Sequence, residues 1–170
     1  MSVGDESGSS SVNFETMRGR DYPSIRQFTV FLENRVGQLL QLIRRFEGSR
    51  VRIVALNIQD NNECSIARFV LSHPEQGREI LERAGLAMVE SDLIGVRLPS
   101  TSQQPLMEIC LALLQAEINL IQAYPLIINA DDYCGVALMV DEIEMAQQTL
   151  AEKKFHMTTE QEFIDLHEDI

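Results

Sequence analysis

The order in which strand-like and helix-like segments follow one another limits the fold of this chain more than any other feature. Short apolar runs rich in β-branched and aromatic residues predict strands, whereas apolar residues at helical spacing predict helices. Residues 27–99 give six segments in the order strand, helix, strand, strand, helix, strand. They are "QFTVFL" (27–32), the helical pattern after Gly37, "VRIVALNI" (51–58), "CSIARFVLS" (64–72), the helix that opens at Pro74, and "LAMVESDLIGVRLP" (86–99).

The same order returns further along the chain. When the sequence is shifted along itself by 67 residues, "VRIV" (51–54) falls on "INLI" (118–121) and "RFVL" (68–71) falls on "GVAL" (135–138). The match lies in polarity rather than in identity, and we expect it to run without an insertion. It predicts a second copy that starts near Leu93, with helices over 104–115 and 142–153. Such self-similarity at a fixed shift indicates a tandem repeat.

This element order is the βαββαβ order of a ferredoxin-like sandwich. We therefore expect an α+β fold of two tandem ferredoxin-like βαββαβ sandwiches, each an antiparallel sheet with its helices on one face and its other face free. The expected divisions are a flexible N-terminal segment (1–26), a first copy (27–92) and a second copy (93–170) with an acidic C-terminal tail. The tail, "TTEQEFIDLHEDI", is expected either to complete the last strand or to dock on a partner.

The charge of the chain narrows the choice of partners. The net charge is −12 over 170 residues, which argues against nucleic acid and against anionic membrane surfaces as partners. Residues 100–170 hold 13 Asp and Glu but only two basic residues, Lys153 and Lys154. This acidic surface is either a solvated face or a surface for a basic partner.

No motif for a metal, a cofactor or catalysis stands out. The three cysteines, Cys64, Cys110 and Cys134, form no CxxC pair, so we expect buried thiols in a reducing compartment and a cytoplasmic protein. The chain has no apolar run of about 18 residues, so we expect no membrane span. It also has no Ser/His/Asp spacing and no glycine-rich phosphate loop, so we expect it not to be an enzyme.

The stretch "FTVFLENRVGQL", followed 14 residues after Gly37 by "VRIVAL", resembles the start of an ACT domain. Members of that family sense small molecules, and they usually carry Asp or Glu-Asn, a variable residue, then Pro-Gly-x-Leu, and a second strand that begins Ile-Asn-Ile. In this chain Val36 stands in place of the common proline and Arg52 in place of the common asparagine. The resemblance is clear over 27–92 and weak over 93–163.

The chemistry of the loop fits this resemblance. Gly37 lacks a Cβ, so the backbone can bend sharply and a ligand can approach it closely. The amides from Val36 to Leu40 lie at a helix start, where they carry partial positive charge and suit a carboxylate. Asn34 can donate and accept hydrogen bonds, which suits an amino acid. The alternative is that Asn34 only caps the helix and Gly37 only makes a turn.

In ACT domains the ligand commonly lies between two paired domains, held by the loop of one and the second-strand asparagine of the other. The resemblance therefore implies a site at the interface between the two copies. A second, degenerate site would contain Arg52 and Gln104. The residues of the first site would be Asn34, Val36, Gly37, Gln38 and Leu39 from the first copy, with Asn119 from the second.

The sequence therefore favours a non-catalytic regulatory protein that binds a small amino acid and signals through its own oligomer or to a partner. One alternative is a regulatory chain similar to the small subunit of acetolactate synthase, whose partner would be a catalytic subunit. Another is an interaction module that binds no ligand. We expect no cofactor and no metal in any of the three cases.

Overall fold

The computed structural model describes residues 22–60, 64–128 and 133–168. Residues 1–21, most of the expected N-terminal segment, lie outside the described residues. The first copy comprises β1 (Ile25–Glu33), α1 (Gln38–Arg44), β2 (Ile53–Asp60), β3 (Cys64–Leu71), α2 (Pro74–Arg83) and β4 (Met88–Arg97). The rest comprises α3 (Pro105–Gln115), β5 (Leu120–Pro125), β6 (Gly135–Val140), α4 (Ile143–Glu152), β7 (His156–Thr158) and α5 (Glu160–Glu168). The expected element order is confirmed.

Strand pairing gives two ferredoxin-like sheets that share one strand. The strand order is β2-β3-β1-β4-β6-β5, and β7 also pairs with β4. The first half of β4 pairs with β1, from Val30 opposite Met88 to Ile25 opposite Leu93. The second half, from Ile94 onward, pairs with β6 and β7. All these pairs are antiparallel, so β4 serves as the last strand of one copy and the first strand of the next.

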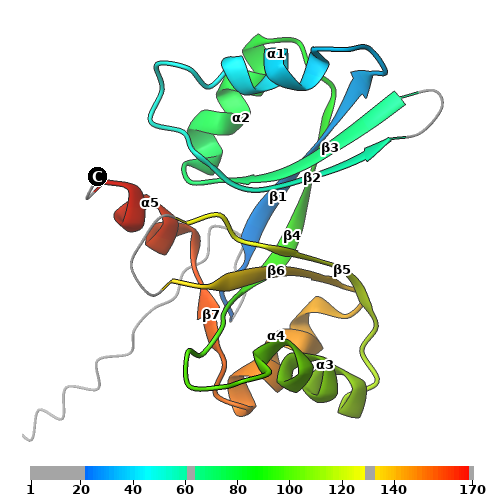
Figure 1. Cartoon of the computed structure of the whole chain (residues 1–170), viewed down its shortest axis with the longest axis vertical. Helices are drawn as coiled ribbons and strands as arrows, with labels where there is room; N and C mark the ends of the chain where they lie inside the picture. The colour runs from blue at the N-terminus through cyan, green and yellow to red at the C-terminus, as the bar shows by residue number, and fades with distance from the viewer. Residues whose placement is uncertain (1–21, 61–63, 129–132, 169–170) are drawn as a thin grey trace, which may run out of the picture.

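The two sheets pack face to face, with the paired helices outside. Figure 1 shows α1 and α2 at one end, α3 and α4 at the other, and the sheets between them. Three apolar clusters follow from this layering. Phe28 and Phe69 belong to the cluster under α1 and α2, and Ile109 and Leu138 to the one under α3 and α4. The third lies between the sheets: Ile25, Val54, Ala55, Val70, Leu93, Tyr124, Leu126, Ala137 and Phe163. Each free face is therefore partly covered by the other copy.

A buried polar contact accompanies the apolar cluster between the sheets. The Tyr124 hydroxyl of β5 donates to Gln27 Oε1 of β1, and Gln27 Nε2 donates to Ser91 Oγ at 3.0 Å. The Gln27 side chain is fully buried, so these bonds satisfy polar atoms that would otherwise be costly to bury.

The C-terminal tail forms helix α5, which docks on the chain itself. Phe163 is fully buried in the cluster between the sheets. Glu160 accepts three hydrogen bonds from Arg26, from its backbone N–H at 2.9 Å, its Nε at 2.8 Å and its Nη2 at 3.0 Å. Arg26 Nη1 also contacts Glu75 of α2 at 2.6 Å. Burial opposes the Arg26 charge, but these carboxylates outweigh it and raise the pKa of Arg26. The expectation that the tail completes the last strand is wrong, because β7 ends at Thr158.

Three further details differ from expectation. The expected buried thiols are not buried, because Cys110 and Cys134 are exposed and Cys64 is half-buried. Strand β1 begins at Ile25, so Ile25 and Arg26 belong to the sheet. Helices α2 and α4 begin at Pro74 and Ile143, which lie 69 residues apart, whereas the shift is 67 between α1 and α3. The repeat therefore does contain a two-residue insertion, because the connection from β5 to β6 is longer than its counterpart. Within the described ranges, no helix is long and apolar enough to cross a bilayer.

Candidate functional site

The loop that joins β1 to α1 is short and open. Residues 34–37 are all exposed, and the Val36 side chain has no cover at all. Two backbone hydrogen bonds shape the turn, from Arg35 N to Glu33 O at 2.8 Å and from Gln38 N to Arg35 O at 3.3 Å. An ion pair between Arg35 and Glu33 lies on the same loop. The loop is therefore held by local contacts and is accessible from outside.

Gly37 has the backbone conformation that the loop requires. Its φ is 90°, a left-handed value that side chains disfavour, and it precedes the first residue of α1. A Cβ added at this position would meet nothing within 4 Å. Glycine is thus needed here for the backbone turn rather than for packing within the chain. The space beside it is open to a ligand or to another chain.

Helix α1 offers less charge than the sequence suggested. It has only seven residues, Gln38–Arg44, so its dipole is small, and no side chain caps its first turn. Gln38 begins the helix, and Leu39 packs partly against the cluster under α1 and α2. Asn34 makes an interaction of its own within the chain. Any anion bound here would depend on individual backbone amides.

Asn119 lies in the other copy, on an exposed turn before β5. Its backbone N–H donates to Asp141 Oδ1 at 3.0 Å, and its carbonyl accepts from Asp141 N at 3.2 Å. The Gly37 loop follows β1 at the end of that strand far from the second copy, whereas Asn119 follows α3 in the second copy (Figure 1). A single chain thus does not bring Asn34 and Asn119 together.

The residues of the expected second site are also apart. Arg52 is exposed, and its Nη1 donates to the carbonyls of Ser49 at 3.1 Å and Val51 at 3.3 Å. Gln104 is exposed directly before α3, where its backbone N–H donates to Ser102 Oγ at 3.2 Å. These two side chains therefore belong to different copies without a contact between them among the described residues.

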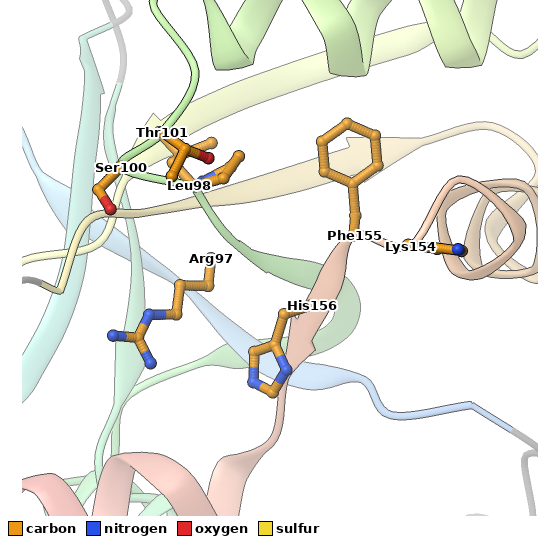
Figure 2. A pocket seen from close by; sticks show the side chains of 8 residues that line it. Arg97, Leu98, Ser100, Thr101, Lys154, Phe155 and His156 are labelled. Atoms are coloured by element: carbon orange, nitrogen blue, oxygen red, sulfur yellow. The ribbon is translucent and has the colours of Figure 1, made fainter.

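A cavity of about 500 Å³ lies in the second copy, where sequence analysis placed no site. Its walls are the loop after β4 and the segment that enters β7 (Figure 2): Arg97, Leu98, Pro99, Ser100, Thr101, Lys154, Phe155 and His156. Arg97 and His156 are paired across the two strands. His156 Nε2 lies 3.0 Å from Glu162 Oε1 of α5. The sequence contains one indication of this cavity: Arg97 and Lys154 are two of the three Lys and Arg residues in 93–170.

Tyr133 links this region to the rest of the second copy. The Arg97 guanidinium carbon lies 5.2 Å from the centre of the Tyr133 ring, a cation–π distance. The Tyr133 hydroxyl is 2.7 Å from Thr158 Oγ1 of β7, and burial raises the pKa of Tyr133. The arginine is therefore oriented by an aromatic side chain that is itself fixed to the sheet.

Other proteins of known structure share the fold of this chain. A crystal structure of protein BT0572 from Bacteroides thetaiotaomicron superposes with a TM-score of 0.75 at 19% identity, covering 85% of this chain and 99% of that one. The ligand-free regulatory subunit of aspartate kinase from Thermus thermophilus superposes with a TM-score of 0.52 at 8% identity, covering 78% and 98%. At such identities the likeness concerns the fold alone.

Comparison of the sequence itself gives the family. No curated protein matches this chain. The family model described as "ACT domain pair" matches residues 23–167, which is most of the chain and includes both copies. The resemblance seen in the Gly37 loop is thereby confirmed, and it extends over the second copy as well. The chain belongs to the ACT domain pair family.

Proposed function

We propose that this protein is a non-catalytic regulator that binds a small amino acid at the loop from Asn34 to Leu39. The observation that carries the proposal is Gly37, whose left-handed backbone bends an exposed loop in a chain that belongs to the ACT domain pair family. Backbone amides beside an open glycine can receive a carboxylate, and the Asn34 amide can bind an ammonium or a carboxylate. The relative from Thermus thermophilus is itself a regulatory subunit.

The second part of the site comes, in this proposal, from another chain. Asn119 lies far from Asn34 within one chain, so a ligand that contacts both must lie between two chains. A dimer would place the loop of each chain beside Asn119 of the other, which gives two equivalent sites related by a two-fold axis. Ligand binding would then favour one arrangement of the two chains, and the difference in affinity between arrangements is the regulatory signal.

A thermal-shift screen of the twenty amino acids tests the binding. A ligand at 100 times its dissociation constant should stabilise the chain by about 2.7 kcal/mol. Asn34→Ala and Asn119→Ala should each abolish most of this shift, whereas Gln148→Ala, which changes an exposed amide on α4, should leave it intact. The absence of a shift with every amino acid would contradict the proposal and favour a module that binds no ligand.

Mixing the two variants tests whether the site is shared between chains. If Asn34 and Asn119 of different chains complete one site, a mixture of Asn34→Ala and Asn119→Ala chains recovers binding that neither has alone. Random exchange between dimers would restore roughly one site in four, and calorimetry gives this stoichiometry. Co-purification with a catalytic chain would instead indicate the regulatory-subunit alternative.

A further inference from the structure

One cavity of the second copy is lined by basic side chains. Residues 93–170 contain 13 Asp and Glu but only three Lys and Arg, and two of the three, Arg97 and Lys154, line the cavity together with His156. A concentration of positive charge in an otherwise acidic domain attracts anions locally. We propose that this cavity is a binding site for a small organic anion, separate from the Gly37 loop and complete within one chain.

The two copies differ at this place in a way that creates the cavity. Four residues join β1 to α1 in the first copy, whereas seven residues, 98–104, join β4 to α3 in the second. The longer loop brings Ser100 and Thr101 to the cavity. Its volume of about 500 Å³ lies in the range of ligand pockets, which extends from roughly 300 to 1,000 Å³.

Lys154 reaches the rim of the cavity through a left-handed turn at the end of α4. It follows α4 with a φ of 64°, and the Phe155 N–H bonds to the Leu150 carbonyl at 3.0 Å. In the first copy the matching residue after α2 is Gly85, with a φ of 68°. A left-handed residue at this position is usually glycine, because a Cβ is disfavoured there. The second copy therefore has a lysine at the rim of the cavity where its counterpart has glycine. Glu117 after α3 is also left-handed, with a φ of 57°, so this backbone conformation is shared by two helix ends and does not by itself mark the cavity.

The lining of the cavity defines the class of ligand. Figure 2 shows the Arg97 and His156 side chains on the same side of their strands, while Lys154 extends away from them along the rim. A guanidinium beside an imidazole suits carboxylate or phosphate oxygens. Phe155 also lines the cavity, but its ring points away from Arg97 and His156 and packs against the cluster under α3 and α4 (Figure 2). The proposed ligand is thus a small organic carboxylate or phosphate ester.

Glu162 is the natural competitor for this ligand. Its carboxylate lies 3.0 Å from His156 Nε2, so a bound anion has to share or replace that contact. Because Glu162 belongs to α5, binding of the anion would be felt by the helix that also carries Glu160 and Phe163. The site would in this way report to the interface between the two copies.

Calorimetric titration of the full chain tests the site with four probes: inorganic phosphate and glycerol 3-phosphate, and acetate and succinate. Sodium chloride at matched ionic strength is the control. Saturable binding in either series supports the proposal and assigns the chemical class. Arg97→Gln should weaken binding at least about tenfold, since it removes a charge-assisted contact. Lack of saturable binding by all four probes, or unchanged affinity in Arg97→Gln, would overturn the proposal.

A variant that is expected to tighten binding makes the test sharper. Glu162→Gln removes the competitor and should tighten binding several-fold, whereas Asp165→Asn on the same helix changes the net charge equally but should have little effect. Equal tightening in both would show a general charge effect and overturn the site.

Lys154→Gly should raise the melting temperature and weaken binding, while Lys153→Ala should not weaken it. Unchanged affinity in Lys154→Gly would remove the lysine from the site.

Discussion

At the scale of single residues, the contact between Tyr124 and Gln27 joins the two copies through buried polar atoms. Tyr124→Phe removes the donor to Gln27 Oε1 while keeping the ring in place. Because the acceptor then stays buried without a partner, we expect the free energy of unfolding at pH 7 to fall by about 1–2 kcal/mol. Urea denaturation of parent and variant measures this difference.

The same tyrosine predicts a dependence on alkaline pH. Burial raises the pKa of Tyr124 above its ordinary value of 10.0. The folded state therefore holds this proton more tightly than the unfolded state, so the contribution to stability is full below about pH 10 and is lost as the pH rises further. The stability of Tyr124→Phe should fall less steeply above pH 10. Identical alkaline slopes for parent and variant would contradict this assignment.

At the scale of elements, helix α5 is anchored to β1 by the buried ion pair between Glu160 and Arg26. Arg26 is only 8% exposed, so Glu160→Gln leaves a buried charge with one carboxylate partner, Glu75. We expect a loss of about 2–3 kcal/mol of stability. The control is Glu79→Gln, which breaks the exposed ion pair with Arg83 on α2 and should change stability by less than about 0.5 kcal/mol. Equal losses in both variants would show that α5 is not held by this contact.

Sequence patterns predicted the elements well where a single face was buried. The strand "RFVL" and the helix that starts at Pro74 follow from local periodicity and a proline in the first turn, and both are present. Helix α5 was missed because Phe163, the one fully buried side chain among residues 160–167, packs between the two sheets rather than along a stripe of its own. One buried residue among these eight carries too little periodicity to predict a helix.

At the scale of the whole molecule, two apolar surfaces with opposite charge favour association of two chains. The first is on α1 and β2, where Leu40 and Ile58 are about half exposed, and Arg44 and Arg45 at the end of α1 are exposed as well. The second is on α3 and β5, with Glu108 and Glu117 nearby: Met107, Leu111, Leu114 and Ile121. β2 and β5 end the strand order, although the Ile127 N–H just after β5 donates to the Val54 carbonyl of β2 within the chain. Pairing of the first surface with the second is favoured by charge, whereas pairing of like surfaces is opposed.

We therefore predict a dimer in which the first surface of each chain contacts the second surface of the other. Leu111→Glu with Leu114→Glu should convert it to a 19.2 kDa monomer, as measured by light scattering. Arg44→Glu with Arg45→Glu should weaken the dimer at low salt, and adding Glu108→Arg and Glu117→Arg should restore it. A failure of the second exchange to restore the dimer would contradict pairing between unlike surfaces.

The candidate site could be predicted only in part, because part of it depends on how the two copies and their strands pack. The Gly37 loop is visible in the sequence because the left-handed turn requires glycine locally. The distance between Asn34 and Asn119 depends on how the two free sheet faces pack, and alternation of polar and apolar residues fixes which face is buried but not against what. Likewise, Arg97 and His156 become neighbours only through the pairing of β4 with β7.

The shared strand β4 makes the duplication indivisible. A protein cut between Leu93 and Ile94 would leave each half with an exposed rim of unpaired amides and carbonyls, so neither fragment should survive alone in soluble form. A shift of the pairing register by one residue in β4 would move its side chains to the opposite face of the sheet in both copies at once. Because β4 runs from Met88 to Arg97 without a break, the two copies meet inside one strand rather than at a linker.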